Sequence, residues 1–345
     1  MIEINDLAVC LGEFRLRGIT LSIEEGAFFA LMGPTGSGKT VLLEAIAGLV
    51  PIQGGSIHLK QRDITRLPPE KRGIGIMYQD YALFPHLTVA GNITFGLRYG
   101  ARDGHKAEKH FSTMVDALGI DHVLQRYPET LSGGELQRAA LARALIVEPR
   151  VVLLDEPLSA LDPNFREDIR AMLGEIHHSL GVTFVIVTHD FAEALSLASR
   201  AAVMHDGTIR QVGTIQDIFR KPTSSFVADF VGMKNIFAAT FEQNAARLDQ
   251  FALQVMGRPV NGGGHIAIRP EDITLSLSAG TALDGNCVPG VVTGIVDQGI
   301  FYEVRVSAGD QLFCTVVTKS AAFDLSLAVG MSVHLSFPPQ AVHVF

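Results

Sequence analysis

The stretch that decides the fold is "GPTGSGKT", residues 33–40. The apolar run "AFFALMG" (27–33) leads into it, and the helix-like segment "KTVLLEAIAGLV" (39–50) follows it. A G-x-x-x-x-G-K-[ST] pattern between a buried strand and a helix is typical of a phosphate-binding loop rather than of an ordinary glycine-rich turn. Its glycines let the backbone curl so that its amides face the phosphates. The sequence therefore predicts a nucleotide-binding α/β protein.

The loop residues have distinct expected roles. Lys39 would reach the β- and γ-phosphates, and the Thr40 hydroxyl would ligate Mg²⁺. The expected nucleotide contacts are all the residues of the loop: Gly33, Pro34, Thr35, Gly36, Ser37, Gly38, Lys39 and Thr40.

A second apolar run ends in two carboxylates. "RVVLLDE" (150–156) predicts a buried strand, and Asp155 and Glu156 emerge at its carboxyl end, where α/β sheets bind their ligands. Asp155 suits the Mg²⁺ shell, and Glu156 suits polarisation of an attacking water, because phosphoryl transfer requires mainly positioning and charge neutralisation. Alone, such a pair is usually a polar strand end, but beside a phosphate loop it predicts the catalytic edge.

Three further residues fit this site, and each has a structural alternative. Gln79 in "MYQDYALFP" (77–85) could touch Mg²⁺ and the attacking water, or be a plain loop glutamine. His189 ends the apolar run "TFVIVTHD" (183–190) and could reach the γ-phosphate, although a lone histidine there is more often structural. Asp162 in "LSALDP" (158–163) could be a helix N-cap ahead of proline as well as a contact in a dimer.

The rest of the chain shows two different sequence patterns. Apolar runs alternate with helical stretches through the first two-thirds, and residues 80–130 are polar and helical, including the amphipathic "DGHKAEKHFSTMVDALGI" (103–120). After about residue 235, period-two runs such as "YEVRVS" (302–307), "SVHLSF" (332–337) and "AVHVF" (341–345) predict a small all-β, barrel-like domain. We therefore expect domains at 1–234 and 235–345.

The composition limits the classes of function. The chain has 345 residues, of which 47% are hydrophobic and 19% charged, enough for a full core. Its net charge of -8 argues against nucleic-acid binding, which needs a basic face. With no apolar run long enough for a membrane span and no signal-peptide pattern, we expect a soluble intracellular protein. The three cysteines, Cys10, Cys287 and Cys314, lack metal-ligand spacing and are expected to be reduced core thiols.

A second helix start suited to an anion occurs at "LSGGELQR" (131–138), called the signature segment below. Ser132 and Glu135 form an S-x-x-E capping box at the head of "ELQRAALARALIV" (135–147), a helix that Pro149 stops. Capping does not explain Gly133 and Gly134, because glycine in a first helical turn costs up to about 1 kcal/mol relative to alanine.

The two glycines suggest that an anion approaches bare backbone amides at this helix N-terminus. The phosphate loop already covers one face of the triphosphate. The signature segment is therefore most useful on the opposite face of a nucleotide held by another copy of the chain. This predicts a head-to-tail dimer with two ATP molecules at its interface, closed by ATP and released by hydrolysis.

Taken in order, "GPTGSGKT", Gln79, "LSGGE", "VVLLDE", "SALD" and His189 resemble the nucleotide-binding subunit of an ABC transporter. The resemblance covers about residues 1–235. It implies an ATP- and Mg²⁺-dependent ATPase whose residues 80–130 form a helical subdomain and whose region near residues 79–95 receives the coupling helix of a permease. It also implies a homodimer at the cytoplasmic face of the membrane, served indirectly by an extracytoplasmic solute-binding protein.

The tail, with "IAIRPEDITL" (266–275), resembles the C-terminal TOBE-type β domain of importer ATPases. The layout, including "LPPEKRGIGIMYQDYALFPH" (67–86), is most similar to that of molybdate/tungstate importer subunits, and sulfate, ferric-ion and polyamine importers share it. A regulatory oxyanion pocket is expected from four tail residues: Asn286, Thr318, Lys319 and Ser320. Where the family stacks adenine on an aromatic residue, this chain has Leu11, so Phe14 is expected to take that role.

Two other classes of function remain open at this point. A soluble ABC ATPase of DNA repair would need a long heptad insertion, and a ribosome-acting one usually has two phosphate loops and a basic surface; this acidic chain has one such loop. The tail could alternatively make the chain a small-molecule sensor or a dimer scaffold. Co-purification of a polytopic membrane partner separates the importer subunit from both.

Overall fold

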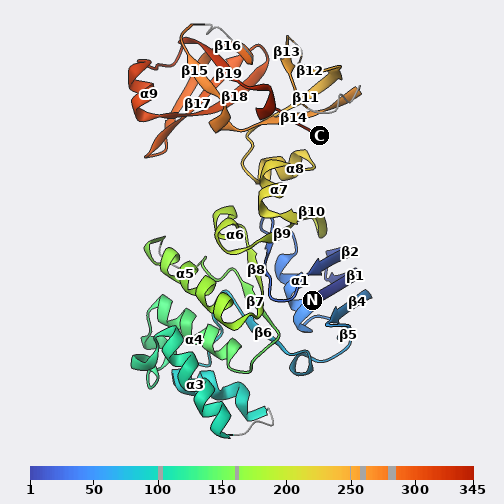
Figure 1. Cartoon of the computed structure of the whole chain (residues 1–345), viewed down its shortest axis with the longest axis vertical. Helices are drawn as coiled ribbons and strands as arrows, with labels where there is room; N and C mark the ends of the chain where they lie inside the picture. Colours follow the sequence, from blue (N-terminus) through green and yellow to red (C-terminus); the bar gives the residue numbers. More distant parts are fainter. Residues whose placement is uncertain (100–103, 160–162, 249, 257–261, 279–284) are drawn as a thin grey trace. The chain divides into compact units, whose positions relative to one another are not determined.

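The structure, a computed structural model, describes residues 1–99, 104–159, 163–248, 250–256, 262–278 and 285–345 (Figure 1). The chain forms two compact units, Met1–Gln216 and Asp217–Phe345, and each is described by itself. The division at residues 234/235 into separately folding domains stays a prediction.

A six-stranded sheet forms the centre of the first unit (Figure 1). Its order is β10-β9-β3-β8-β7-β6; the pairings from β9 to β6 are parallel, and β10 is antiparallel to β9. The bounds are β3 Phe28–Met32, β6 Ile74–Met77, β7 Val151–Asp155, β8 Thr183–Thr188, β9 Arg200–His205 and β10 Thr208–Thr214. Every residue of β3, β7 and β8 is buried, which confirms the three strands predicted from continuous apolar runs.

The strand register brings the carboxyl ends of four parallel strands to the same edge of the central sheet. Met32 of β3 pairs with Thr188 of β8, and Val187 of β8 pairs with Asp155 of β7. On the other side of β7, Leu154 pairs with Met77 of β6. Because these strands are parallel, the segments that follow all four of them leave the sheet at the same edge.

Helices and a smaller sheet cover the central sheet. The helices of this part are α1 Lys39–Ala47, α5 Pro163–Leu180 and α6 Phe191–Leu197. The smaller antiparallel sheet has the order β2-β1-β4-β5, with bounds β1 Ile2–Leu11, β2 Phe14–Ile23, β4 Gly54–Leu59 and β5 Arg62–Asp63. Its inward residues, among them Ile4, Leu7 and Ile57, share one core with residues of α1, β3, β7 and β8.

The segment between β6 and β7 is mostly helical. It contains α2 Val89–Thr94, α3 Gly104–Leu118, α4 Gly133–Leu145 and the 3₁₀ turns η2 Phe95–Tyr99, η3 Asp121–Val123 and η4 Pro128–Thr130; a further turn, η1 Pro69–Lys71, precedes β6. Helix α4 packs against α2 and α3 (Figure 1). Helix α4 begins at Gly133, directly after its capping residue Ser132, as the predicted capping box requires. It ends at Leu145, before Pro149.

The second unit is mostly β. Two antiparallel five-stranded sheets, β13-β12-β11-β14-β20 and β15-β19-β16-β17-β18, enclose one apolar core. The strands are β11 Asn235–Glu242, β12 Ala245–Leu248, β13 Phe251–Gln254, β14 Gly262–Ile268, β15 Thr274–Ser276, β16 Asn286–Asp297, β17 Phe301–Ala308, β18 Gln311–Thr318, β19 Ser332–Phe337 and β20 His343–Val344. Helix α7 Ile215–Arg220 spans the boundary between the two units, and the second unit also contains α8 Ser225–Phe230, α9 Lys319–Asp324 and the turns η5 Pro270–Asp272 and η6 Pro339–Ala341.

Two expectations about composition can be compared with the structure. The prediction of three core thiols is wrong: Cys10 is exposed on β1, and Cys287 and Cys314 are half-buried, although all three are free. Cys10 faces out because β1 buries alternate residues around Val9. None of the helices in the described part of the chain is long and apolar enough to cross a membrane.

Candidate active site

The phosphate loop joins β3 to α1 through three glycines with positive φ. Gly33 has φ 148°, and a Cβ there would lie 2.3 Å from the Met204 carbonyl oxygen. Gly38 caps α1 with φ 101°, and a Cβ there would lie 2.6 Å from Phe14 Cζ. At Gly36, with φ 80°, a Cβ would meet no atom within 4 Å. The loop is thus packed tightly at Gly33 and Gly38 and is open beside Gly36, as a phosphate cradle requires.

Lys39 lies at the start of α1 with its ammonium group turned back to the loop. Its Nζ donates hydrogen bonds of 2.9 Å to the carbonyl oxygens of Gly33 and Pro34. Burial lowers the pKa of Lys39, and the Glu156 and Asp155 carboxylates oppose this effect. The carboxylates therefore help to keep a buried ammonium charged, as phosphate binding requires.

Thr40 and Asp155 meet across the sheet edge. The Thr40 hydroxyl donates a 3.1 Å hydrogen bond to Asp155 Oδ1, although 115 residues separate the two. Burial raises the pKa of Asp155, while the hydrogen bond from Thr40 lowers it. A hydroxyl and a carboxylate at this distance are hard oxygen ligands, so these residues fit Mg²⁺. Among the described residues no group of three or more His, Cys, Asp and Glu side chains could hold a metal ion.

Glu156 and His189 form a pair at the same edge. His189 Nδ1 lies 3.3 Å from Glu156 Oε1, and the Glu156 side chain is 20% exposed against 54% for His189. Glu156 has φ 44°, a left-handed conformation that a non-glycine residue adopts at a cost of about 1–3 kcal/mol. Its N–H donates to the Val187 carbonyl oxygen at 3.0 Å, which anchors the strained turn to β8.

A pocket of about 370 Å³ brings eight of the predicted site residues together. Its lining combines the loop with the segments that follow β6 and β7: Thr35, Gly36, Gly38, Lys39, Thr40, Val41, Gln79, Glu156 and Phe14. Gln79 is exposed two residues beyond the end of β6, in the position predicted for it. The sequence analysis did not single out Val41, whose apolar side chain carries no signal of its own.

The aromatic wall of this pocket is Phe14. Leu11 and Phe14 pair across the β1–β2 hairpin, but Leu11 is 37% exposed and does not line the pocket. The close approach of the Phe14 ring to Gly38 places an apolar face directly beside the phosphate loop. Phe14 as the adenine contact is therefore consistent with the structure and stays a proposal.

Comparisons with known proteins identify the family of the chain. The family model described as ABC transporter matches residues 16–159, and the one described as TOBE domain matches residues 266–345. The chain is 39% identical over 345 residues to the molybdate/tungstate import ATP-binding protein WtpC of Pyrococcus horikoshii, with 100% of both chains covered. The chain belongs to the ABC transporter family. It is an ABC ATPase with a C-terminal TOBE domain.

Two further relatives extend the comparison. The sulfate/thiosulfate import ATP-binding protein CysA of Nocardia farcinica is 39% identical over 345 residues, covering 97% of this chain and 96% of its own. Among solved structures, the dimeric post-hydrolysis state of the ATP-binding cassette MJ0796 bound to ADP and Pi matches with a TM-score of 0.56 and 30% identity. It covers 62% of this chain and 99% of its own.

The signature segment of the ABC ATPase has the predicted capping box. Ser132 N–H and Oγ donate to Glu135 Oε2 at 2.7 and 2.9 Å, and Glu135 N–H donates to Ser132 Oγ at 3.4 Å. The backbone hydrogen bond from Ser132 is the main cause that lowers the pKa of Glu135. A Cβ on Gly134 would meet no atom within 4 Å, so the amides are open to an approaching group. In the described part of the chain none of these residues lines the nucleotide pocket.

One contact at the site gave no signal in the sequence. Arg143 of α4 donates hydrogen bonds to the Ala82 and Tyr81 carbonyl oxygens at 2.6 and 2.9 Å. Tyr81 and Ala82 follow Gln79 and both have positive φ, 61° and 45°. The helix that the signature segment begins therefore holds the loop that carries Gln79. Asp162, the remaining predicted site residue, lies outside the described residues.

The four tail residues expected to bind an oxyanion do not meet within one chain. Asn286 begins β16 and exchanges hydrogen bonds of 2.6 and 3.0 Å with the Gln254 backbone. Lys319 instead pairs at 3.1 Å with Asp297, at the other end of β16, which is on the order of 30 Å along the strand. Thr318 caps α9 and contacts Ser320. A pocket made of all four would need residues from another chain.

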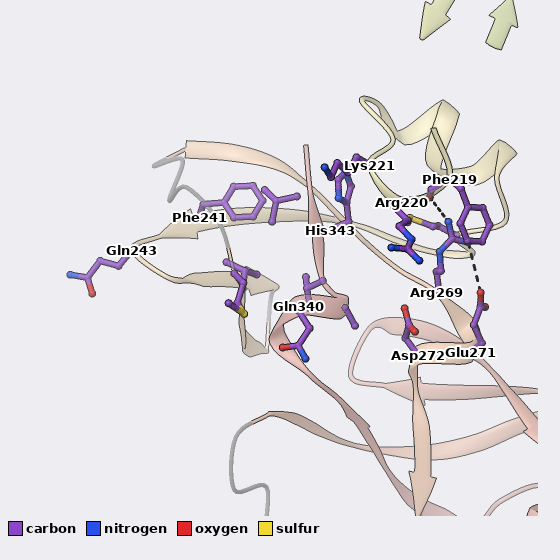
Figure 2. A pocket seen from close by; sticks show the side chains of 16 residues that line it. Phe219, Arg220, Lys221, Phe241, Gln243, Arg269, Glu271, Asp272, Gln340 and His343 are labelled. Carbon is purple, nitrogen blue, oxygen red and sulfur yellow. Dashed lines mark hydrogen bonds and ion pairs between the residues drawn. The ribbon is translucent and has the colours of Figure 1, made fainter. Parts of the chain in front are cut away.

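A separate cavity of about 780 Å³ lies within the second unit (Figure 2). Arg269 lies on its wall, where it donates to the carbonyl oxygens of Phe219 and Val231, and its guanidinium stacks 3.4 Å from the Phe219 ring centroid. Glu271 is its ion-pair partner at 3.8 Å (Figure 2). Arg269 makes all of these contacts within the second unit.

Because Asp155 is buried, we expect its carboxylate to lower the stability of the fold in a pH-dependent way, although ATP hydrolysis requires it. Burial raises the pKa of Asp155 above the ordinary 3.8. At a pH above this raised pKa the ionised carboxylate therefore destabilises the fold, and at a pH below 3.8 this destabilisation is absent, because the group is protonated in both the folded and the unfolded state. We expect Asp155→Asn to raise the free energy of unfolding at pH 7 by about 1 kcal/mol, a common gain at strained functional sites. Urea denaturation at pH 7, 5 and 4 should show this gain shrinking as the pH falls, while ATP hydrolysis is lost.

The exposed carboxyl of Asp116 supplies the control. Asp116→Asn should leave both stability and hydrolysis near the wild-type values across the same pH range. A gain for Asp155→Asn that is constant from pH 7 to 4 would show that ionisation of Asp155 is not its cause.

Proposed function

We propose that this ABC ATPase is the ATP-hydrolysing subunit of an import complex for a small oxyanion, molybdate or tungstate. The observation that carries the ATPase chemistry is the single edge where Lys39, Thr40–Asp155 and Glu156–His189 converge. The match over 100% of both chains to a molybdate/tungstate import ATP-binding protein supports the solute. A relative named for sulfate/thiosulfate is also 39% identical, so sulfate is the alternative that the experiment must separate.

The residues divide the chemistry among them. The loop amides and Lys39 bind the β- and γ-phosphates, and Phe14 supplies an apolar face for the adenine. Thr40 and Asp155, with Gln79, would hold Mg²⁺, which neutralises charge that develops on the phosphates. Glu156 accepts a hydrogen bond from the attacking water and orients it in line with the γ-phosphate. His189, 3.3 Å from Glu156, donates to the γ-phosphate.

The signature segment completes the site from a second copy. Gly133 is exposed, the space beside Gly134 is open, and with the Ser132 hydroxyl they would face an anion that the pocket of their own chain does not supply. Asp162 would contact the same interface. A related cassette solved as a dimer with ADP and Pi supports a homodimer that closes on two ATP molecules.

Transport requires partners that this chain contacts outside the nucleotide pocket. The segment near residues 79–95 runs from Gln79 to α2 and would receive the permease, which places the chain at the cytoplasmic face of the membrane. A solute-binding protein would act through that permease. Arg143 ties this segment to α4, so movement of the permease would reach both Gln79 and the signature segment.

The test is reconstitution of the chain with its permease in liposomes. ATP hydrolysis should rise at least about tenfold when the solute-binding protein carries molybdate or tungstate, a size typical of coupling between sites. Sulfate-loaded protein should stimulate less. Stimulation by sulfate alone would reassign the solute, and failure to co-purify any polytopic partner in mild detergent would contradict the import function while leaving the ATPase assignment in place.

A further inference from the structure

Two buried polar side chains lie directly behind His189. Thr188 ends β8 and is 2% exposed, and Glu193 lies in the first turn of α6 and is 3% exposed. The Thr188 hydroxyl donates a 2.6 Å hydrogen bond to Glu193 Oε2 and accepts one of 2.9 Å from the Asp190 N–H. One hydroxyl therefore joins the end of β8, the residue after His189 and helix α6.

The backbone on both sides of His189 is held by these contacts. Before it, Thr188 is in register with Met32 of β3. After it, the Asp190 carboxylate caps α6 by accepting from the Ala192 and Glu193 N–H groups at 2.7 and 3.4 Å. The His189 side chain itself is 54% exposed, and its ion-pair contact is Glu156. Because little packs against the imidazole, its direction depends on the backbone that carries it.

If Glu193 served only to fill space, burying its carboxylate would cost desolvation free energy without any return. Burial raises the pKa of Glu193, and Thr188 and the arginines Arg170 and Arg166 oppose this effect. A neutral side chain would fill the same volume without the desolvation cost. What the carboxylate adds is a short charge-assisted hydrogen bond, in the 2.5–2.7 Å range of the strongest O–H···O⁻ pairs. Such a bond fixes the Thr188 hydroxyl in one orientation.

We propose that the Thr188–Glu193 pair positions His189 for ATP hydrolysis, by locking residues 188–190 so that the imidazole faces Glu156 and the γ-phosphate. Neither side chain touches the substrate; both act through His189. This inference rests on the role proposed above for His189. Loss of the pair leaves nucleotide binding by the phosphate loop unchanged and releases the imidazole, so it lowers kcat and not the affinity for ATP.

The test compares kcat and KM for ATP across matched variants. Thr188→Val and Glu193→Ala should each lower kcat by about 10- to 100-fold, the size expected when a catalytic group moves by up to 1 Å, with KM changed less than twofold. Thr188→Ser keeps the hydroxyl and should restore kcat to near the wild-type value. Thr183→Val is the control, because Thr183 lies at the opposite end of β8, is 3% exposed and accepts a 2.9 Å hydrogen bond from the Gly26 N–H.

A double variant separates positioning from general stability. If the pair acts through His189, then adding Glu193→Ala to His189→Ala should lower kcat no further than His189→Ala alone. Rates are expressed per nucleotide-binding site, so partial unfolding does not count as loss of kcat. Multiplicative losses in the double variant, or an equal loss of kcat in Thr183→Val and Thr188→Val, would overturn the inference.

The same variants separate the role proposed for His189 from the role proposed for the Thr188–Glu193 pair. Wild-type kcat in His189→Ala would remove the proposed role of His189 itself. A low kcat in His189→Ala beside near-wild-type values in Thr188→Val and Glu193→Ala would keep that role and reject the positioning pair alone.

Discussion

Glu156→Gln is expected to lower the rate of ATP hydrolysis by about 10²- to 10⁴-fold, the usual contribution of a positioned general base. The amide keeps the size of the side chain but cannot take a proton from water. Binding should be unaffected, because Lys39 and the loop amides hold the phosphates without Glu156. The ATP-bound dimer should then persist, and light scattering after gel filtration should show twice the monomer mass with ATP and monomer without it.

The control is Glu70→Gln, an exposed carboxylate in the turn before β6. It should hydrolyse ATP at the wild-type rate and show no ATP-dependent accumulation of dimer. If Glu156→Gln also hydrolyses at the wild-type rate, Glu156 has been given the wrong role, and His189 becomes the residue to test as the base.

The left-handed backbone conformation at Glu156 explains how two adjacent carboxylates, Asp155 and Glu156, can have different roles. Asp155 is the last residue of β7 and points into the sheet edge beside Thr40. The left-handed turn at Glu156 then reverses the chain at once, with the Glu156 carbonyl held by the Ser159 N–H and hydroxyl at 3.2 and 2.9 Å. Two adjacent carboxylates thereby serve different roles, one toward the metal site and one toward the water. Their adjacency is visible in the sequence, but the turn that separates them is not.

Local patterns were enough to predict the central strands and the phosphate loop. Continuous apolar runs predict strands that are buried on both faces, and β3, β7 and β8 are buried throughout. The register pairs Met32 with Thr188 and Asp155 with Val187, and because these strands are parallel, the residues after each strand had to meet at one edge. The capping box at Ser132 depends on residues three apart and was equally readable.

Contacts between distant segments were beyond these patterns. Phe14 lies against Gly38 because the antiparallel sheet β2-β1-β4-β5 folds over α1, and no local periodicity specifies that packing. The hydrogen bonds from Arg143 to Tyr81 and Ala82 span about sixty residues of chain. A family pattern grouped Asn286 with Lys319, but Asn286 begins β16 and Lys319 pairs with Asp297 at the other end of that strand. In each case the deciding quantity is three-dimensional placement rather than residue type.

An equal mixture of Lys39→Ala and Ser132→Arg chains is expected to regain ATP hydrolysis that neither variant has alone. Lys39→Ala removes the phosphate-binding ammonium, and Ser132→Arg places a bulky side chain over the open amides of the signature segment. If each site combines the loop of one chain with the signature segment of the other, a mixed dimer has one site with both defects and one intact site. Half of the dimers are mixed and half of their sites are intact, so activity should approach about a quarter of wild type.

The mixing experiment shows whether the signature segment acts on the nucleotide of its own chain or on that of the partner chain. A signature segment that served its own chain would leave every site in the mixture defective, and the rate would stay at the sum of the two variants. Ser132→Arg also removes an N-cap worth about 1 kcal/mol, but Lys39→Ala chains cannot repair a misfolded partner, so recovery excludes misfolding as the cause. Nucleotide binding by Ser132→Arg monomers should match wild type, because Ser132 does not line the pocket formed by Lys39, Thr40 and Phe14. Recovery in the mixture together with intact monomer binding would establish that the anion at Ser132–Glu135 is the γ-phosphate held by the partner chain.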